Sequence, residues 1–173
     1  MKKAYENMRA FWLDAKNFES RKGVIEIGPD KIIAAGVEMG VFDGKEVKCI
    51  LVAANSLGDI SLYFENNSTS GVGGFIGGNR SEALQETAAH MLAYAGKLSG
   101  QMTLCADKNL PPPAEHGQVV LFALAKDKLF SVQLSEAQAR TRENPFFPMF
   151  AYSQQVIGHF KKMEEEQTPQ GKA

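Results

Sequence analysis

The sequence predicts an α+β fold in which helices pack on a largely antiparallel sheet of about seven strands. Apolar residues recur at helical spacing in three segments, and the short apolar or alternating runs between them are typical of strands. The elements follow one another as α-β-β-β-β-α-β-β-β-α, and runs of strands separated by single helices are typical of α+β proteins. Short turns separate neighbouring strands, which antiparallel strands allow and parallel strands do not.

The first half of the chain is predicted to contain one helix and four strands. The helix covers residues 4–19, and its apolar stripe contains Met8, Phe11, Trp12, Ala15 and Phe18. The strands cover residues 24–27, 31–42, 46–54 and 59–65. Asp43-Gly44 is the strongest hairpin signal, because a type I′ turn needs positive φ at both central residues. Glycines inside a strand, here Gly36 and Gly40, indicate bulges, curvature or a close approach of another backbone.

The second half is predicted to contain two helices and three strands. Asn79 and Glu82 have the spacing of a capping box at the start of the central helix, which ends at Ser99-Gly100. Asn144-Pro145 is typical of the start of a helix, so the last helix is expected over about residues 145–165. The three strands cover residues 101–106, 118–125 and 129–134.

Length and composition predict one domain over residues 1–163, with a disordered polar tail over residues 164–173. A net charge of −1 with only scattered basic pairs argues against a nucleic-acid partner. No run approaches the roughly 20 apolar residues that a membrane helix needs, so no membrane association is expected. The N-terminus lacks the apolar core of a signal peptide, and a cytoplasmic location is expected, where Cys49 and Cys105 stay reduced.

A glycine-rich segment precedes the central helix and is the first candidate site. Backbone N–H groups at a helix start can bind an anion, and glycine lets a ligand approach closely. The spacing matches neither the P-loop nor the dinucleotide-binding pattern. Two interpretations therefore stay open: a tight turn that serves packing, or a site for an anion or a protein partner. The candidate residues are Gly73, Gly74, Phe75, Ile76, Gly77, Gly78, Asn79 and Arg80.

Catalytic and metal-binding residues are not indicated by any motif. The histidines, His90, His116 and His159, lie far from one another and from both cysteines, so no local metal motif exists. No nucleophile elbow is present, and the aspartates at turns have a structural explanation. We therefore expect no catalytic residue, no metal and no cofactor.

A segment rich in aromatic residues at the start of the last helix is the second candidate site. Its four aromatic residues exceed what one helix face can bury, so some must point elsewhere. Packing on the sheet and a homodimer interface are equally favoured, because aromatic residues and methionine are enriched at interface cores. The interface candidates are Phe146, Phe147, Phe150 and Tyr152.

The sequence thus favours a non-enzymatic protein-interaction module that forms a homodimer or binds another protein. The alternative is a small-molecule or anion-binding protein, with an enzyme included, that uses the glycine-rich loop. A weaker alternative is a proton- or redox-responsive protein that uses His90, His116 and Cys105. The succession of elements resembles that of profilin-like scaffolds such as roadblock and longin domains, which implies helices flanking an antiparallel sheet and implies no function.

Overall fold

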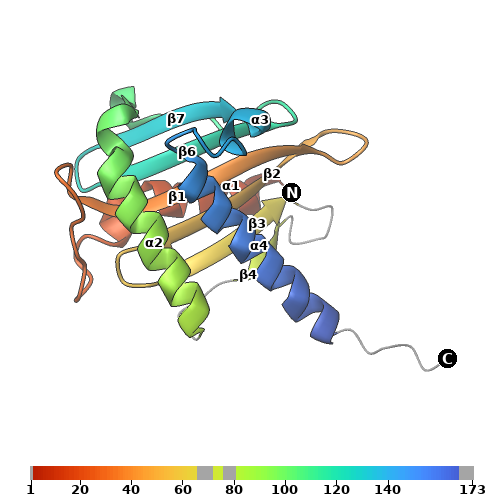
Figure 1. Cartoon of the computed structure of the whole chain (residues 1–173), viewed down its shortest axis with the longest axis horizontal. Helices are drawn as coiled ribbons and strands as arrows, with labels where there is room; N and C mark the ends of the chain where they lie inside the picture. Colours follow the sequence, from red (N-terminus) through yellow and green to blue (C-terminus); the bar gives the residue numbers. More distant parts are fainter. Residues whose placement is uncertain (1, 66–71, 76–80, 168–173) are drawn as a thin grey trace.

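A computed structural model describes residues 2–65, 72–75 and 81–167 of the chain and shows the predicted α+β class. Its sheet is antiparallel throughout, with the strand order β4-β3-β2-β1-β6-β7-β5 (Figure 1). The strands are β1 (Ile32–Phe42), β2 (Val47–Asn55), β3 (Ile60–Glu65), β4 (Val72–Phe75), β5 (Thr103–Leu104), β6 (Gln118–Ala125) and β7 (Leu129–Ser135). The four strands β1 to β4 form one half of the sheet and the three strands β5 to β7 form the other, so the two halves meet only along the β1–β6 ladder.

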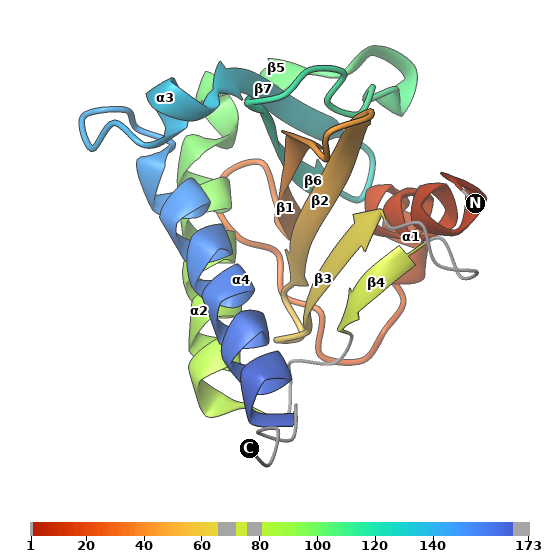
Figure 2. The same cartoon turned by 90° about the vertical axis from the view of Figure 1, so that its right-hand side faces the viewer.

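Helices cover both faces of the sheet, as Figure 2 shows. The long helices α2 (Glu82–Leu98) and α4 (Phe147–Gln167) lie side by side on one face, and α1 (Lys2–Leu13) lies on the other. Strand β1 supplies both cores, because successive side chains point to opposite faces. Val37 belongs to the core under α2 and α4, whereas Ala34 belongs to the core under α1.

Helix α1 differs from its predicted form in length and in its buried face. It ends at Leu13, and a short 3-10 turn, Ala15–Asn17, follows it. Tyr5 and Trp12 are each only 2% exposed, whereas Phe11, predicted to be buried, is 41% exposed. The polar Tyr5 is buried because its hydroxyl has a partner inside the protein, which the apolar pattern alone does not reveal.

The strand count of seven agrees with the prediction, but one predicted strand is absent and one observed strand was not predicted. Residues 24–27 form no strand and contribute only an isolated bridge between Ile27 and Ile32. This segment runs against α2: a Cβ on Gly28 would lie 2.3 Å from the carbonyl oxygen of Gly96. The fourth strand is instead β4, inside the glycine-rich segment, where the ladder with β3 compensates for the low strand propensity of glycine.

Several element boundaries also differ from the predicted ones. The side chain of Ser81 caps α2 by accepting a hydrogen bond from the Leu84 N–H. Asn79, the predicted cap, lies outside the described residues. The predicted strand over 101–106 reduces to the two residues of β5, and α4 begins at Phe147. A short helix without a predicted counterpart, α3 (Glu136–Ala139), begins in a capping box at Ser135. Of the predicted tail, residues 164–167 belong to α4, and residues 168–173 lie outside the described residues.

The hairpin at Asp43-Gly44 is present, although not as a type I′ turn. Strand β1 ends at Phe42 and β2 begins at Val47, so the loop is longer than the predicted turn. The Asp43 carboxylate accepts hydrogen bonds from the N–H groups of Lys45 and Glu46, and Gly44 has a φ of 97°. Within the described part of the chain, no helix is long and apolar enough to cross a bilayer.

Candidate functional site

The glycine-rich segment contributes the edge strand of the sheet. Gly73, Gly74 and Phe75 lie in β4 and pair with Phe64, Tyr63 and Leu62 of β3. Gly74 has a φ of 126°, and a Cβ there would lie 1.8 Å from the Leu62 carbonyl oxygen, so glycine is required. Ile76, Gly77, Gly78, Asn79 and Arg80 lie outside the described residues. Anion or partner binding at this segment therefore stays a prediction.

The four aromatic interface candidates divide between the core and the surface. Phe146 and Phe150 are 6% and 2% exposed and belong to the core under α2 and α4. The guanidinium group of Arg140 covers the Phe150 ring, with its carbon 5.3 Å from the ring centre. Phe147 and Tyr152 are half-buried. Only these two remain available to a partner.

Tyr152 belongs to an aromatic cluster where α4 meets α2. Its ring is stacked on that of His90, with 5.1 Å between ring centroids and an angle of 6° between ring planes. The centroid of the Tyr94 ring lies 6.1 Å from that of the Tyr152 ring. His90 is exposed and both tyrosines are half-buried, so the cluster reaches the surface. The interface predicted for the last helix stays a prediction.

The remaining histidines and the cysteines lie in separate places. The His116 Nδ1 accepts a hydrogen bond of 3.2 Å from the Phe42 N–H, and His159 lies half-buried on α4. Cys49 is buried in β2 with its Sγ 3.6 Å from the Pro113 carbonyl oxygen, and Cys105 Sγ lies 3.2 Å from the Ser131 hydroxyl. Neither Cys49 nor Cys105 is part of a disulfide bond. Among the residues that the structure describes, no three His, Cys, Asp or Glu side chains are placed so as to hold a metal ion.

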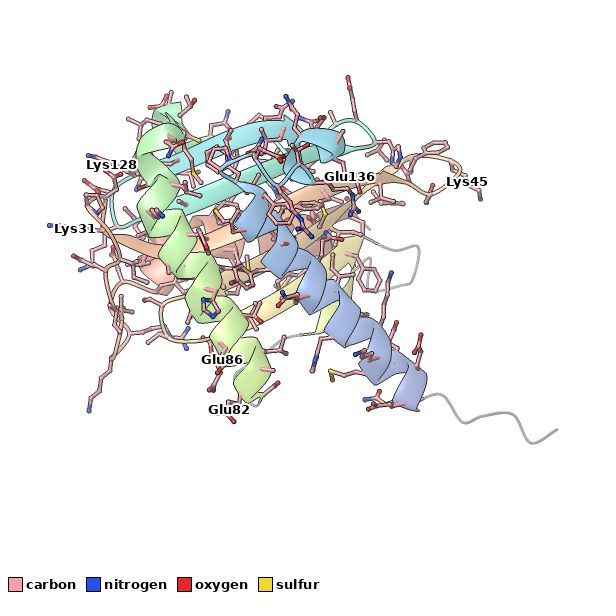
Figure 3. All side chains as sticks on the ribbon, viewed as in Figure 1. Lys31, Lys45, Glu82, Glu86, Lys128 and Glu136 are labelled. Atoms are coloured by element: carbon pink, nitrogen blue, oxygen red, sulfur yellow. The ribbon has the colours of Figure 1, made fainter. Side chains whose placement is uncertain are left out.

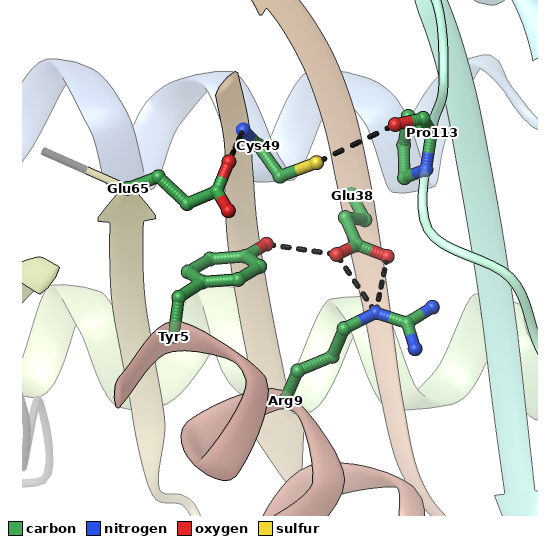
Figure 4. Close-up of polar contacts among 6 residues, drawn as sticks. All are labelled: Tyr5, Arg9, Glu38, Cys49, Glu65 and Pro113. Atoms are coloured by element: carbon green, nitrogen blue, oxygen red, sulfur yellow. Dashed lines mark hydrogen bonds and ion pairs between the residues drawn. The ribbon is translucent and has the colours of Figure 1, made fainter. Parts of the chain in front are cut away.

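A buried polar cluster under α1 has no counterpart among the predicted sites. Glu38, in the middle of β1, is 1% exposed. The Tyr5 hydroxyl donates a hydrogen bond of 2.8 Å to one carboxylate oxygen of Glu38, and Arg9 Nε lies 2.9 Å from both oxygens (Figure 4). Tyr5 and Arg9 are one helical turn apart on α1, so both reach the same point of the sheet. The cluster fixes α1 on the sheet by directional contacts.

Burial dominates the electrostatics of this cluster. It raises the pKa of the Glu38 carboxyl above its usual value, against the opposing effects of the Arg9 charge and the hydrogen bonds from Tyr5 and Arg9. Burial, followed by the Glu38 charge, raises the pKa of the Tyr5 hydroxyl well above its usual value. Tyr5 therefore remains a hydrogen-bond donor at all ordinary pH values. The carboxyl is a proton-binding group held away from water.

The two glycines that flank Glu38 on the same face of β1 make room around it. A Cβ on Gly36 would lie 2.4 Å from the Phe122 ring, and one on Gly40 would lie 2.2 Å from the Glu115 carbonyl oxygen. Gly40 thus lets the segment before β6, residues 109–117, cross this face of the sheet. We call this segment the connector. The close backbone approach predicted from these glycines is confirmed.

A pocket of about 370 Å³ lies between α1 and the connector. Arg9 lines it, so it borders the buried cluster. At its rim, Asp107 and Lys108 have φ angles of 52° and 54°, in the left-handed region that residues other than glycine rarely adopt. The lining residues are Glu6, Arg9, Ala10, Leu13, Lys108, Asn109, Leu110 and Pro112. The only sequence signal for the cluster was one acidic residue, Glu38, within a long apolar strand.

No family model matches the sequence, and no curated protein is significantly similar to it. The function has therefore to be inferred from the chain's own residues and contacts.

Proposed function

We propose that this protein is a non-enzymatic interaction module that forms a homodimer through the exposed side of α2 and the adjoining part of α4. The observation that carries the proposal is the half-exposed aromatic cluster of His90, Tyr94 and Tyr152. Aromatic residues are enriched at the cores of protein interfaces, where their large rings bury much area at low entropic cost. The cytoplasm, where Cys49 and Cys105 would stay reduced, is the proposed location.

Four exposed residues of α2 support a contact with a second copy of the chain. Glu86, His90, Ala93 and Lys97 are all exposed and recur at spacings of four, three and four, so they form one stripe. We call it the outer stripe; Glu86 lies near its N-terminal end (Figure 3). Its two ends carry opposite charges, and its middle holds one ring and one small side chain.

A two-fold axis through the middle of the outer stripe makes it complementary to itself. With two α2 helices antiparallel across that axis, Glu86 faces the partner subunit's Lys97, and His90 faces the partner subunit's Ala93. The small side chain of Ala93 leaves room for the opposing ring. Two-fold dimers use the same patch on both subunits, and they are the commonest soluble assembly. The charge pattern thus favours a second copy over an unrelated partner.

Analytical ultracentrifugation over a concentration series tests the proposal. We expect a reversible dimer in the wild type, and Ala93→Arg should yield monomers because it places a large charge at the axis. Ala10→Arg is the matched control, since Ala10 is also an exposed alanine on a helix but lies on the opposite face of the sheet. A wild type that stays monomeric at the highest soluble concentration would refute the dimer.

Charge reversal tests the antiparallel arrangement itself. Glu86→Lys and Lys97→Glu should each weaken the dimer, because each brings like charges together twice per dimer. The double variant should restore the wild-type affinity, because it exchanges the charges without changing their pairing. Exposed ion pairs contribute roughly 0.2–1 kcal/mol each, so each single change should shift the dissociation constant several-fold. A double variant as weak as the single ones would contradict this arrangement.

Anion binding at the glycine-rich segment remains the alternative function. A thermal-shift series with phosphates, nucleotides and carboxylates tests it, because a ligand that binds only the folded state raises the melting temperature. Substitution of Arg80, the cation nearest to the start of α2, by glutamine should abolish such a shift.

A further inference from the structure

We propose that the pocket between α1 and the connector binds a small monocarboxylate with an apolar body, and that the outer edge of the Arg9 guanidinium receives its carboxylate group. The site lies on the opposite face of the sheet from α2 and α4, so it does not depend on the proposed dimer.

Arg9 has unused hydrogen-bonding capacity. Only its Nε contacts Glu38, although a guanidinium carries five N–H donors. Within the described residues, Nη2 is buried and has no hydrogen-bond partner. Buried donors are nearly always paired, so an unpaired one indicates an acceptor that the described part of the chain does not supply. In Figure 4 the two Nη atoms point away from the Glu38 carboxylate.

The Arg9 side chain is preorganised for binding, because its contacts with Glu38 already fix its conformation. Its side chain is 13% exposed, and Glu38 holds the Nε edge while Tyr5 holds Glu38. The long side chain is therefore already ordered before a ligand arrives, and little conformational entropy is lost on binding. A planar pair of N–H groups matches the two oxygens of a carboxylate, which favours bidentate contact.

The walls of the pocket indicate what is attached to that carboxylate. Ala10 and Leu13 on α1, and Leu110 and Pro112 on the connector, are apolar. A volume of about 370 Å³ is at the small end of the range for ligand pockets. An acid with a short aliphatic chain or a single ring fits such a space.

The charges around the pocket favour one negative charge on the ligand. Arg9 and Lys108 supply positive charge, while Glu6 on the same wall supplies negative charge. Glu38 already balances Arg9 when it is ionised. A dianion such as a phosphate monoester would meet repulsion from both carboxylates that one lysine does not offset.

Isothermal titration calorimetry with hexanoate tests the proposal on the full chain. We expect saturable one-site binding by hexanoate, no binding by hexanol, which has no charge, and at least tenfold weaker binding by hexyl phosphate. No heat with hexanoate at its highest soluble concentration would overturn the proposal. Equal binding of hexanol would also overturn it, because the carboxylate would then contribute nothing.

Three variants locate the site. Ala10→Trp fills the pocket from an exposed helix position without changing Arg9, and it should abolish hexanoate binding. Arg9→Lys keeps the charge beside Glu38 but loses the planar edge, and we expect about a tenfold loss of affinity. Lys126→Ala, which removes a lysine outside the pocket, tests for non-specific attraction of the anion to positive charge and should bind as the wild type does. Unchanged binding in Ala10→Trp would place hexanoate elsewhere and refute the assignment.

Discussion

Ionisation of the buried Glu38 carboxyl should lower the stability of the folded protein, and the substitution Glu38→Gln tests this. Glu38→Gln keeps the size and shape of the protonated side chain and removes its ability to ionise. Because Glu38 is only 1% exposed, water solvates its charge poorly, and burial outweighs the attraction to Arg9. We therefore expect the stability of the wild type, compared with that of Glu38→Gln, to fall as the pH rises.

The sign and the size follow from proton linkage. The folded-state pKa of Glu38 lies above its ordinary value of 4.5. The protonated carboxyl therefore contributes its full stability below about pH 4.5, and this contribution is lost as the pH rises through the folded-state pKa. Each unit by which folding raises the pKa corresponds to a loss of about 1.4 kcal/mol in the free energy of unfolding.

Urea unfolding of both proteins at several pH values between about 4 and 8 measures this difference. The test is the pH dependence of the gap between the two free energies of unfolding, since the unpaired Arg9 in the variant only offsets the whole curve. Glu19→Gln, which removes an exposed carboxylate, corrects for the change in net charge. If the wild type gains stability over Glu38→Gln as the pH rises, Arg9 outweighs burial and the reasoning is wrong.

Substitutions at two further positions test contacts described above. Gly40→Ala should lower the free energy of unfolding by about 1–3 kcal/mol, because the new Cβ would lie 2.2 Å from the Glu115 carbonyl oxygen and must displace the connector. Urea unfolding measures this change. A neutral effect would show that the connector moves aside without cost and would contradict the prediction. Ser81→Ala should cost about 1 kcal/mol in the same assay through loss of the α2 cap, whereas Ser81→Asp should retain most of the stability. Equal losses in both Ser81 variants would argue against a capping role.

Local signals in the sequence account for most of the fold. The hairpin at Asp43-Gly44 and the buried stripe of α2, including Met91 and Ala95, follow from turn chemistry and helical spacing, and the structure contains both. Strand β4 could not be predicted in this way. Its glycines disfavour a strand locally, and the element exists because β3 offers an edge with which to pair.

The polar cluster under α1 was missed for a similar reason. Tyr5 and Arg9 are separated from Glu38 by 33 and 29 positions, and nothing near them in the sequence marks the contact. In the aromatic segment, by contrast, helical spacing predicted burial of Phe150 and of either Phe146 or Phe147. The structure shows that Phe146 is the one in the core, together with Phe150. Pairwise contacts over long separations are what the sequence pattern alone does not contain.

The division of the sheet into two halves bears on how the chain folds. Strands β1 to β4 pair in sequence order, and β6 pairs with β7 across a short turn, so each of these ladders closes a small loop. The β1–β6 ladder joins Met39 to Val119 and can form only after a long segment, α2 included, has been brought together. Loop-closure entropy makes such pairing slow. We therefore expect the pairing of β1 with β6 to be the rate-limiting step of folding. Each half of the sheet can form before this step.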